Sequence, residues 1–226
     1  MSTATETAKS PHPASPVTLE ADYEPVLSRW LWLVKWLLAL PHYLVLALLL
    51  VAFVVVEVIA WFAILFTTRF PRALFDFNLG VLRWAWRVSY YAYGSLGTDR
   101  YPPFTLAAVP TYPARLDIAY PEQLSRGLVL VKGWLLVVPQ YLVVSMFVGG
   151  STTGGGLAAL ITFYAGVALL FTNLYPGGLY DLNIGLHRYA ARVLAYGSLM
   201  TDVYPPFRLD QGGREPQLPL RPARES

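Results

Sequence analysis

The 226-residue chain is 55% hydrophobic and only 14% charged, which is too apolar for an ordinary soluble domain. It contains no cysteine, so disulfide frameworks, thiolate catalysis and cysteine-ligated metals are excluded. Its three histidines, His12, His42 and His187, are scattered, and no histidine zinc site is expected. The net charge of +3 is too small to indicate a nucleic-acid-binding surface. The composition favours an integral membrane protein.

The two ends of the chain are polar and contain proline. We expect residues 1–15 and residues 211–226 to be disordered tails. The N-terminal segment lacks a basic stretch followed by an apolar one, so no cleavable signal peptide is predicted.

Between these tails the sequence is duplicated. Residues 66–106 and 171–209 share Phe-Thr, a D-x-N-x-G motif, arginines and T-D-x-Y-P-P-F, and residues 17–45 align with residues 114–143. In the upstream part, each copy keeps Leu-Ser-Arg, a lysine six residues after that arginine, and Pro-x-Tyr-Leu-Val. We therefore divide the chain into repeat 1, residues 16–108, and repeat 2, residues 109–210.

Each repeat opens with alternating apolar and polar residues, around Val17–Tyr23 and Leu116–Tyr120. This alternation predicts short strands. Brief alternation at 104–106 and 207–209 suggests a small cytoplasmic sheet that joins the head and tail of each repeat. An extended loop packed on the membrane face is the alternative.

The apolar stretch between Arg29 and Thr67 is too long for one span of about 20 residues and suits two. Repeat 2 contains GGSTTGGG at residues 149–156, which predicts a flexible turn. We therefore predict a transmembrane hairpin in each repeat, with a tight turn near residues 50–52 in repeat 1. The predicted spans are residues 30–50 and 52–68 in repeat 1, and residues 127–148 and 157–173 in repeat 2.

All 17 lysines and arginines lie outside the hairpin tips and the second spans. The positive-inside rule then places both termini and both motifs in the cytoplasm, and two spans per repeat make the copies parallel. The predicted fold is an all-α, multi-pass protein of the bacterial plasma membrane. Each repeat would be a transmembrane hairpin followed by an interfacial amphipathic helix, at residues 71–97 and 176–200.

Each interfacial helix begins at a proline, Pro71 or Pro176, and carries one narrow charged stripe. Three ionisable groups on one helix make a full span costly, at about 2.5–3.5 kcal/mol each. We expect the arginines to bind anionic lipid phosphates or a partner. Alternatively, Asp76 pairs with an arginine of the other repeat and holds the copies together, or the stripe performs substrate chemistry. The stripes are Asp76, Gly80, Arg83 and Arg87 in repeat 1, and Asp181, Gly185, Arg188 and Arg192 in repeat 2.

Other polar residues are also kept in both copies. Asn78 and Asn183 lie opposite the stripe, where each is expected to hydrogen-bond to a neighbouring span or to backbone. Asp99 and Asp202 precede Tyr-Pro-Pro-Phe and are expected to form turns. The alternative makes these two carboxylates counter-ions for the arginine stripes.

Glu57 is the one acidic residue inside a predicted span, and intramembrane carboxyls are candidates for function. A tight hairpin would bring it to the depth of His42 and allow the two side chains to interact. Repeat 2 has Gln140 and Thr162 at these positions, so this pair is not inherent to the fold. The alternatives are structural neutralisation and a proton-linked role.

The motif FT-x₂-[FY]-P-x₂-L-[FY]-D-x-N-x-G-x₂-R, followed by T-D-x-Y-P-P-F, resembles the actinobacterial membrane family catalogued as domain of unknown function 4389. The resemblance covers both repeats. One departure is the spacing from arginine to threonine, 11 residues from Arg87 to Thr98 but nine from Arg192 to Thr201. The resemblance implies a multi-pass membrane domain with no assigned reaction, catalytic residue or cofactor.

We therefore expect a non-enzymatic membrane protein, an accessory or scaffold subunit that presents its cytoplasmic face to a protein partner, to another copy or to anionic lipid headgroups. A small transporter or channel at the repeat interface is the alternative, although the predicted spans contain few polar residues. A lipid-modifying enzyme is the third hypothesis. The chain lacks a duplicated histidine and the common hydrolase and metalloprotease motifs.

Overall fold

The computed structural model describes residues 15–149 and 156–214, and these residues form a mostly helical fold with one pair of strands. Most of the two predicted tails and most of the glycine-rich turn at 149–156 lie outside the described residues. Residues 211–214 are described, and the prediction of disorder is wrong for this part of the C-terminal tail, because the Gly213 carbonyl accepts from the Ala21 amide at 2.9 Å. The elements in chain order are β1 (Val17–Ala21), α1 (Leu31–Thr67), α2 (Arg72–Tyr91), β2 (Ala114–Ile118), α3 (Arg126–Val131), the π-helical turn η1 (Lys132–Leu136), α4 (Val138–Phe147), α5 (Leu157–Thr172) and α6 (Gly177–Gly197).

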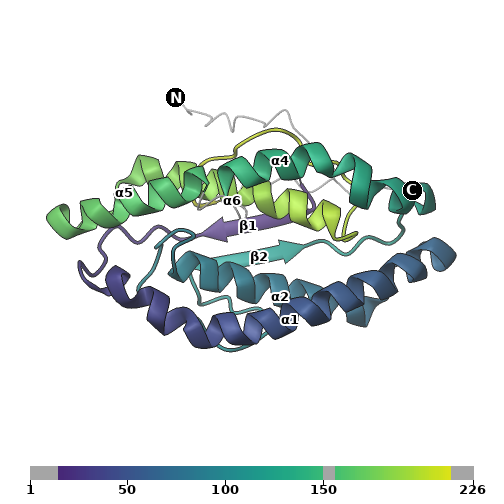
Figure 1. Ribbon diagram of the computed structural model, residues 1–226, viewed down its shortest axis with the longest axis horizontal. Coiled ribbons are helices and arrows are strands. Elements are labelled where there is room, and N and C mark those ends of the chain that lie inside the picture. The colour runs from purple at the N-terminus through teal and green to yellow at the C-terminus, as the bar shows by residue number, and fades with distance from the viewer. Residues whose placement is uncertain (1–14, 150–155, 215–226) are drawn as a thin grey trace, which may run out of the picture.

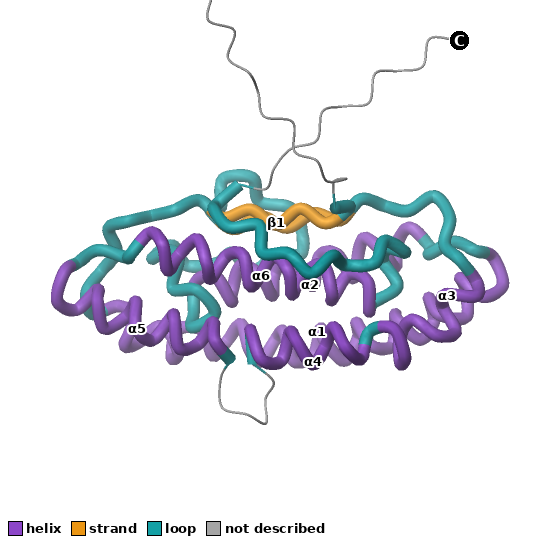
Figure 2. Tube along the Cα trace, turned by 90° about the horizontal axis from the view of Figure 1, so that it is seen from above, coloured by secondary structure: helices purple, strands orange, loops and turns teal. Residues whose placement is uncertain are grey.

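The elements form three layers (Figures 1 and 2). Helix α1 is one long rod, and α3, η1, α4 and α5 follow one another along a second rod that runs in the opposite direction. Helices α2 and α6 make the middle layer, and the strands lie on the far side of it.

Helix α1 shows that the hairpin predicted for repeat 1 is wrong. It runs without a break through residues 50–52, so the two predicted spans are one helix of 37 residues, about 55 Å long. The segment around the expected turn, LLLVAFVVVEV, contains no glycine, proline or asparagine that could end a helix. Helix α1 ends instead at Thr68, which adopts the left-handed conformation with φ 61°.

Repeat 2 also departs from the predicted hairpin. Helices α4 and α5 lie end to end along the second rod rather than side by side (Figures 1 and 2). The predicted span 127–148 is three consecutive pieces, α3, η1 and α4. Pro139, near the start of α4, has no N–H for a helical hydrogen bond, and the Val137 amide bonds to the Lys132 carbonyl five residues back.

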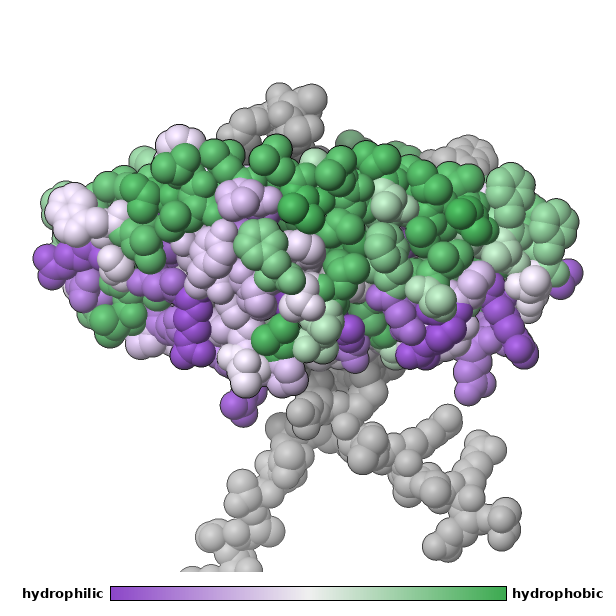
Figure 3. All heavy atoms as spheres, turned by 90° about the horizontal axis from the view of Figure 1, so that it is seen from below, coloured by the Kyte–Doolittle hydropathy of each residue, from purple (hydrophilic) through white to green (hydrophobic). Residues whose placement is uncertain are grey.

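Within the described residues, α1 is the one helix that is long and apolar enough to cross a membrane, with a mean hydropathy of 2.9 over its most apolar window. Helices α4 and α5 are shorter apolar helices. The side chains of α1 and of the second rod give the molecule one apolar face, while charged side chains gather on the opposite side (Figure 3).

The two predicted strands are confirmed, but they pair differently from the prediction. Strands β1 and β2 pair antiparallel with each other, and Leu19 lies opposite Leu116 at the centre of the register. The ribbon therefore joins the heads of the two repeats. Segments 104–106 and 207–209 are not strands, so no sheet joins head to tail within a repeat.

Each strand packs on the motif helix of the other repeat, β1 on α6 and β2 on α2. Matched contacts show a twofold relation between the copies. Tyr23 donates to the carbonyl of Tyr175 at 2.5 Å, and the equivalent Tyr120 donates to the carbonyl of Phe70 at 2.5 Å. Because the strands are exchanged in this way, the two repeats form a single folding unit.

The continuity of α1 predicts that Val51→Pro is strongly destabilising. Proline at this position removes a helical hydrogen bond and clashes with the preceding turn, which costs about 3 kcal/mol or more. The measurement is the thermal unfolding midpoint of the protein in a neutral detergent. Val51→Ala is the matched control and should change stability by less than about 0.5 kcal/mol. A chain that reversed direction at residues 50–52 would tolerate the proline.

Candidate functional site

The two motif helices form the middle layer, and most of their side chains are buried. Both begin as predicted, with Pro71 and Pro176 immediately before the first helical residue. The stripe arginines are nevertheless enclosed, since Arg87 and Arg192 are each 2% exposed and Arg188 is fully buried. The expectation that these three side chains bind lipid phosphates is therefore wrong.

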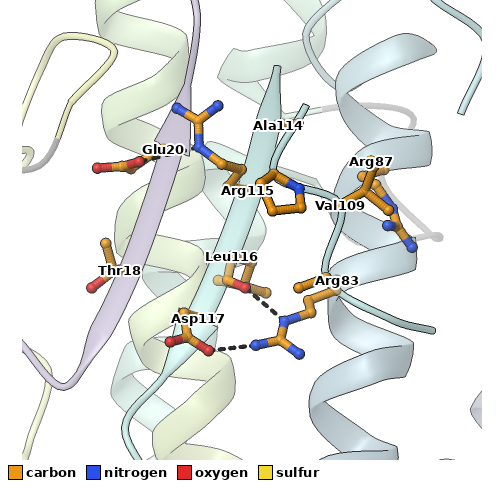
Figure 4. Close-up of a pocket in the computed structure, with 11 residues that line it drawn as sticks. Thr18, Glu20, Arg83, Arg87, Val109, Ala114, Arg115, Leu116 and Asp117 are labelled. Carbon is orange, nitrogen blue, oxygen red and sulfur yellow. Dashed lines mark hydrogen bonds and ion pairs between the residues drawn. The ribbon is translucent and has the colours of Figure 1, made fainter. Parts of the chain in front are cut away.

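Arg83 and Arg188 bind the outer edges of the β-ribbon. In a two-stranded ribbon, alternate backbone groups point outward and have no partner strand. Arg83 donates from Nε to the Leu116 carbonyl at 3.0 Å, and its Nη2 donates to Asp117 at 2.6 Å (Figure 4). The equivalent Arg188 donates to the Leu19 carbonyl from Nε at 3.0 Å and from Nη2 at 2.9 Å. Each arginine thus caps the strand that comes from the other repeat.

The second arginine of each stripe holds the segment that follows Tyr-Pro-Pro-Phe. Arg87 donates to the carbonyls of Ala107, at 3.0 Å, and Thr105. Arg192 forms an ion pair with Asp210 at 2.5 Å, and Ala107 is the repeat 1 residue at that position. Burial lowers the pKa of the Arg87 guanidinium. The arginine stripes therefore hold the ribbon and the post-motif segments onto the helices.

The two stripe aspartates do not pair across the repeats. Asp76 pairs with Arg72, one turn earlier on the same helix, at 3.1 Å, and both side chains are more than half exposed. The predicted pairing of Asp76 with an arginine of the other repeat is therefore wrong. Asp181 is half-buried, and its charge adds to burial in raising the pKa of the Tyr23 hydroxyl.

Asp99 and Asp202 bind lysines and not the arginine stripes. Asp99 forms an ion pair with Lys35 at 2.9 Å and accepts from the backbone amide of Ser28 at 2.6 Å. Asp202 makes the same contacts, with Lys132 at 2.7 Å and with the amide of Ser125 at 2.6 Å. This pairing links Leu-Ser-Arg, the following lysine and Thr-Asp, three elements that the sequence kept in both copies.

The asparagines bind the rods. Asn78 donates to the Glu57 carboxyl on α1 at 2.6 Å. Asn183 donates to the Thr162 hydroxyl on α5 at 3.1 Å and to the Gly94 carbonyl at 3.2 Å. Each asparagine therefore joins the middle layer to the rod of its own repeat.

His42 does not contact Glu57, contrary to the hairpin prediction. The two residues are 15 positions apart on one continuous helix, a rise of about 22 Å. His42 is buried, its ring stacks on Phe104 at 3.9 Å between centroids, and its Nδ1 accepts from the indole N–H of Trp84 at 3.0 Å.

A hollow of about 270 Å³ lies along the outer edge of β2 (Figure 4). Arg115 crosses the ribbon here to bind Glu20 at 3.2 Å and Asp22 at 2.8 Å. The hydrogen bonds from Arg115 lower the pKa of Asp22. The hollow is lined by both charged and apolar groups, among them Thr18, Glu20, Arg83, Val109, Pro110, Arg115 and Asp117.

The equivalent edge of β1 is covered by the chain itself. The Ala21 amide donates to the Gly213 carbonyl at 2.9 Å, and Arg188 donates to the carbonyls of Asp210 and Gly212. In repeat 1 the chain after Ala107 must instead turn back to enter β2, which leaves that edge uncovered. No repeated motif in the sequence marks this hollow, because the residue of repeat 1 that is equivalent to Arg115 is Thr18.

No group of three histidine, aspartate or glutamate side chains that could hold a metal ion occurs in residues 15–149 and 156–214.

These features define a class of protein in which two fused repeats share one β-ribbon and one apolar face. A model of the family described as domain of unknown function (DUF4389) matches residues 29–105 and 133–208, more than half of the chain. The chain belongs to this family, with two tandem copies of its domain. A search of curated proteins and a search of solved structures each returned no match.

Arg188→Met is predicted to destabilise the fold severely. It leaves the outward carbonyl of Leu19 and two carbonyls of the C-terminal segment without their charged donor, at about 1–3 kcal/mol each. The free energy of unfolding in urea, followed by near-ultraviolet circular dichroism, should fall by about 3 kcal/mol or more. Asp76→Asn, in the motif of repeat 1, is the control and should cost less than about 0.5 kcal/mol because its ion pair is exposed. Equal effects of the two changes would contradict the capping role.

Proposed function

We propose that this protein is a membrane-embedded scaffold whose two rods lie flat within one leaflet, and whose ribbon face binds a protein partner in the cytoplasm. The observation that carries the proposal is the opposition of one apolar face to one charged face (Figure 3). Along α1 the apolar face is highly exposed, with Leu44 at 71% and Leu48 at 74%. An apolar surface of this extent is not expected in contact with water.

The length and the ends of α1 favour the flat orientation. At about 55 Å, the helix is much longer than the roughly 30 Å of the hydrocarbon core. Both of its ends are tied to polar groups on the same side of the molecule. Lys35, near one end, donates to the Thr98 carbonyl at 2.7 Å, and the Phe66 carbonyl, at the other end, accepts from Arg126 at 3.0 Å.

The thickness of the rods suits a single leaflet. One helix layer is about 10–12 Å thick, and half of the hydrocarbon core is about 15 Å. The orientation keeps the predicted sidedness, with both motifs on the cytoplasmic side and the twofold axis along the membrane normal, but it needs no transmembrane span.

Anionic lipid headgroups would bind exposed arginines rather than the buried stripes. These residues lie near the ends of the rods and of the middle-layer helices, at the level where headgroups would surround the molecule in this orientation. They are Arg29, Arg69, Arg72, Arg100 and Arg126.

The partner site is the uncovered edge of β2. On the other edge, residues 210–213 show how a segment of chain is held, by a backbone bond to β1 and by carbonyl bonds to Arg188. An extended segment of a partner can add to β2 in the same way. Arg115 and Asp117 at this edge would select its side chains.

Spin labels on α1 test the flat orientation. Leu37, Leu48 and Ile59 are each exposed and lie 11 residues apart, three helical turns, so they share one face. We introduce single cysteines at these positions, since the chain has no native cysteine, and measure membrane depth from relaxation by oxygen and by a water-soluble nickel complex. Equal depths at the three sites are expected.

Other depth profiles contradict the flat orientation. A spanning helix would change depth by about 16 Å between neighbouring labels, which is the rise of 11 residues. A hairpin with its turn at residues 50–52 would place position 48 near one membrane surface, position 59 about 9 Å further towards the other surface, and position 37 about 16 Å further towards it.

A photo-crosslinking residue at the β2 edge tests the partner site. Replacement of Thr18 or Asp117, both exposed and both lining the hollow, should yield one discrete cross-linked product in native membranes. The same residue at the exposed Gln123, which is not part of the hollow, is the control. Labelling of Gln123 alone, or identical products from all three positions, would contradict a partner site at this edge.

A further inference from the structure

A groove of about 320 Å³ opens on the apolar face between the two repeats. Its walls are apolar apart from one acidic side chain, Glu57. The lining residues come from α1, from α3 and from the end of α6, and they are Val54, Glu57, Val58, Trp61, Val129, Gly197 and Leu199. Trp61 fixes one wall, because its indole N–H donates to the Val129 carbonyl across the repeat interface at 3.2 Å.

The polar end of the groove accepts hydrogen bonds and supplies few. Among the residues that the structure describes, the Glu57 carboxyl has a single hydrogen-bond partner, the amide N–H of Asn78 at 2.6 Å. The Oδ1 atom of Asn78 is buried and has no hydrogen-bond partner within the described part of the chain. The nearest lysine along the second rod, Lys132, is held by Asp202 at 2.7 Å. A carboxyl in apolar surroundings is stabilised by a cation or a strong donor.

The second repeat shows the same place closed. Thr162 replaces Glu57, so no carboxyl is present; its hydroxyl accepts from Asn183 at 3.1 Å and donates to the Gly94 carbonyl at 3.1 Å. The buried Oδ1 atom of Asn183, like that of Asn78, has no hydrogen-bond partner in the described part of the chain, so the carboxyl is what distinguishes repeat 1. Phe163 stands where repeat 1 has Val58. The aromatic side chain also comes from the other partner. Trp32 packs on Gly166, and the equivalent residues in the groove are Val129 and Trp61, respectively. The groove is therefore a feature of repeat 1 and not a general gap between the copies.

The position of the groove suits an amphiphile. Glu57 reaches the middle layer through Asn78, which is the level of the lipid headgroups in the orientation proposed above. Val54 and Val58 are 61% and 54% exposed on the apolar face, at the level of the acyl chains. A molecule with a polar head and a hydrocarbon chain can occupy both regions at once.

We infer that this groove binds an amphiphile with a primary ammonium headgroup, whose nitrogen donates to Glu57 and whose hydrocarbon chain lies along Val54, Val58 and Trp61. The choice of an ammonium rests on the acceptors at the polar end, and the choice of a membrane amphiphile rests on the proposed function. Two sources share this chemistry, a free long-chain amine and a phospholipid with an ethanolamine headgroup.

Native mass spectrometry of the full chain in a neutral maltoside detergent tests the inference. The protein is titrated with hexadecylamine, with phosphatidylethanolamine, and with phosphatidylglycerol of the same acyl chains. We expect saturable binding of one amine-bearing molecule and at least tenfold weaker binding of phosphatidylglycerol. Saturation by phosphatidylethanolamine identifies a lipid headgroup as the natural source, and saturation by hexadecylamine alone identifies a free amine.

Two variants distinguish the contribution of the headgroup contact to binding from the contribution of the apolar groove. Glu57→Gln keeps an acceptor for Asn78 but removes the charge, and should weaken amine binding by about tenfold or more. Val58→Phe reproduces the residue of repeat 2, fills the groove and should weaken binding while leaving Glu57 in place. Leu48→Phe adds the same ring elsewhere on the exposed face of α1 and should leave binding unchanged.

Binding that is insensitive to Glu57→Gln, or equal losses from Val58→Phe and Leu48→Phe, would overturn the inference. The measurement in detergent does not depend on how the protein lies in a membrane. Failure of the flat orientation in the spin-label experiment and failure of the amine site are therefore separate results.

Discussion

The fold depends on two arginines that satisfy the outward carbonyls of a two-stranded ribbon. A ribbon of this size has two edges and cannot stabilise itself in isolation. Arg83 caps the strand of repeat 2 and Arg188 caps the strand of repeat 1, so each repeat supplies the donor that the other one needs. This exchange explains why the charged stripe occurs twice, and why its guanidinium groups are buried although they lie on otherwise apolar helices.

The same exchange gives the molecule its two faces. With the ribbon fixed over α2 and α6, both rods are left on the opposite side, where their apolar side chains have no protein to cover them. Where the two copies have diverged, their surfaces differ. Glu57 in place of Thr162 opens a groove on the apolar face, and the return of the chain into β2 leaves a hollow on the polar face. The sites proposed for a ligand and for a partner thus lie where the two repeats differ from each other.

Much of the local structure could be predicted from the sequence. The repeats, the two strands and the helices that start after Pro71 and Pro176 follow from periodicity and from helix-start signals. The hairpins were wrong because hydropathy measures how apolar a stretch is and not whether it turns. A run of 37 helical residues is compatible with two short spans by composition, but as one helix it keeps the backbone hydrogen bonds that a turn at residues 50–52 would break. Three pairings offered from the sequence were also wrong. The contact of Glu57 with His42 assumed the hairpin, and the alternatives that paired Asp76 or Asp99 with an arginine assumed that the charged stripes pair with one another or with a nearby motif residue.

The sequence by itself determined that the chain is a duplicated, mostly helical member of its family, that charge and apolar surface are kept apart, and which polar residues are kept in both copies. Only the tertiary structure decided what those residues bind. Lys35 with Asp99 and Arg83 with Leu116 are contacts between segments at least 33 residues apart, and one of the acceptors is a backbone carbonyl that no side-chain pattern reveals. A motif specifies which groups need partners, because burying an unpaired charge or carbonyl is costly. The packing of the whole chain determines which partner each group meets.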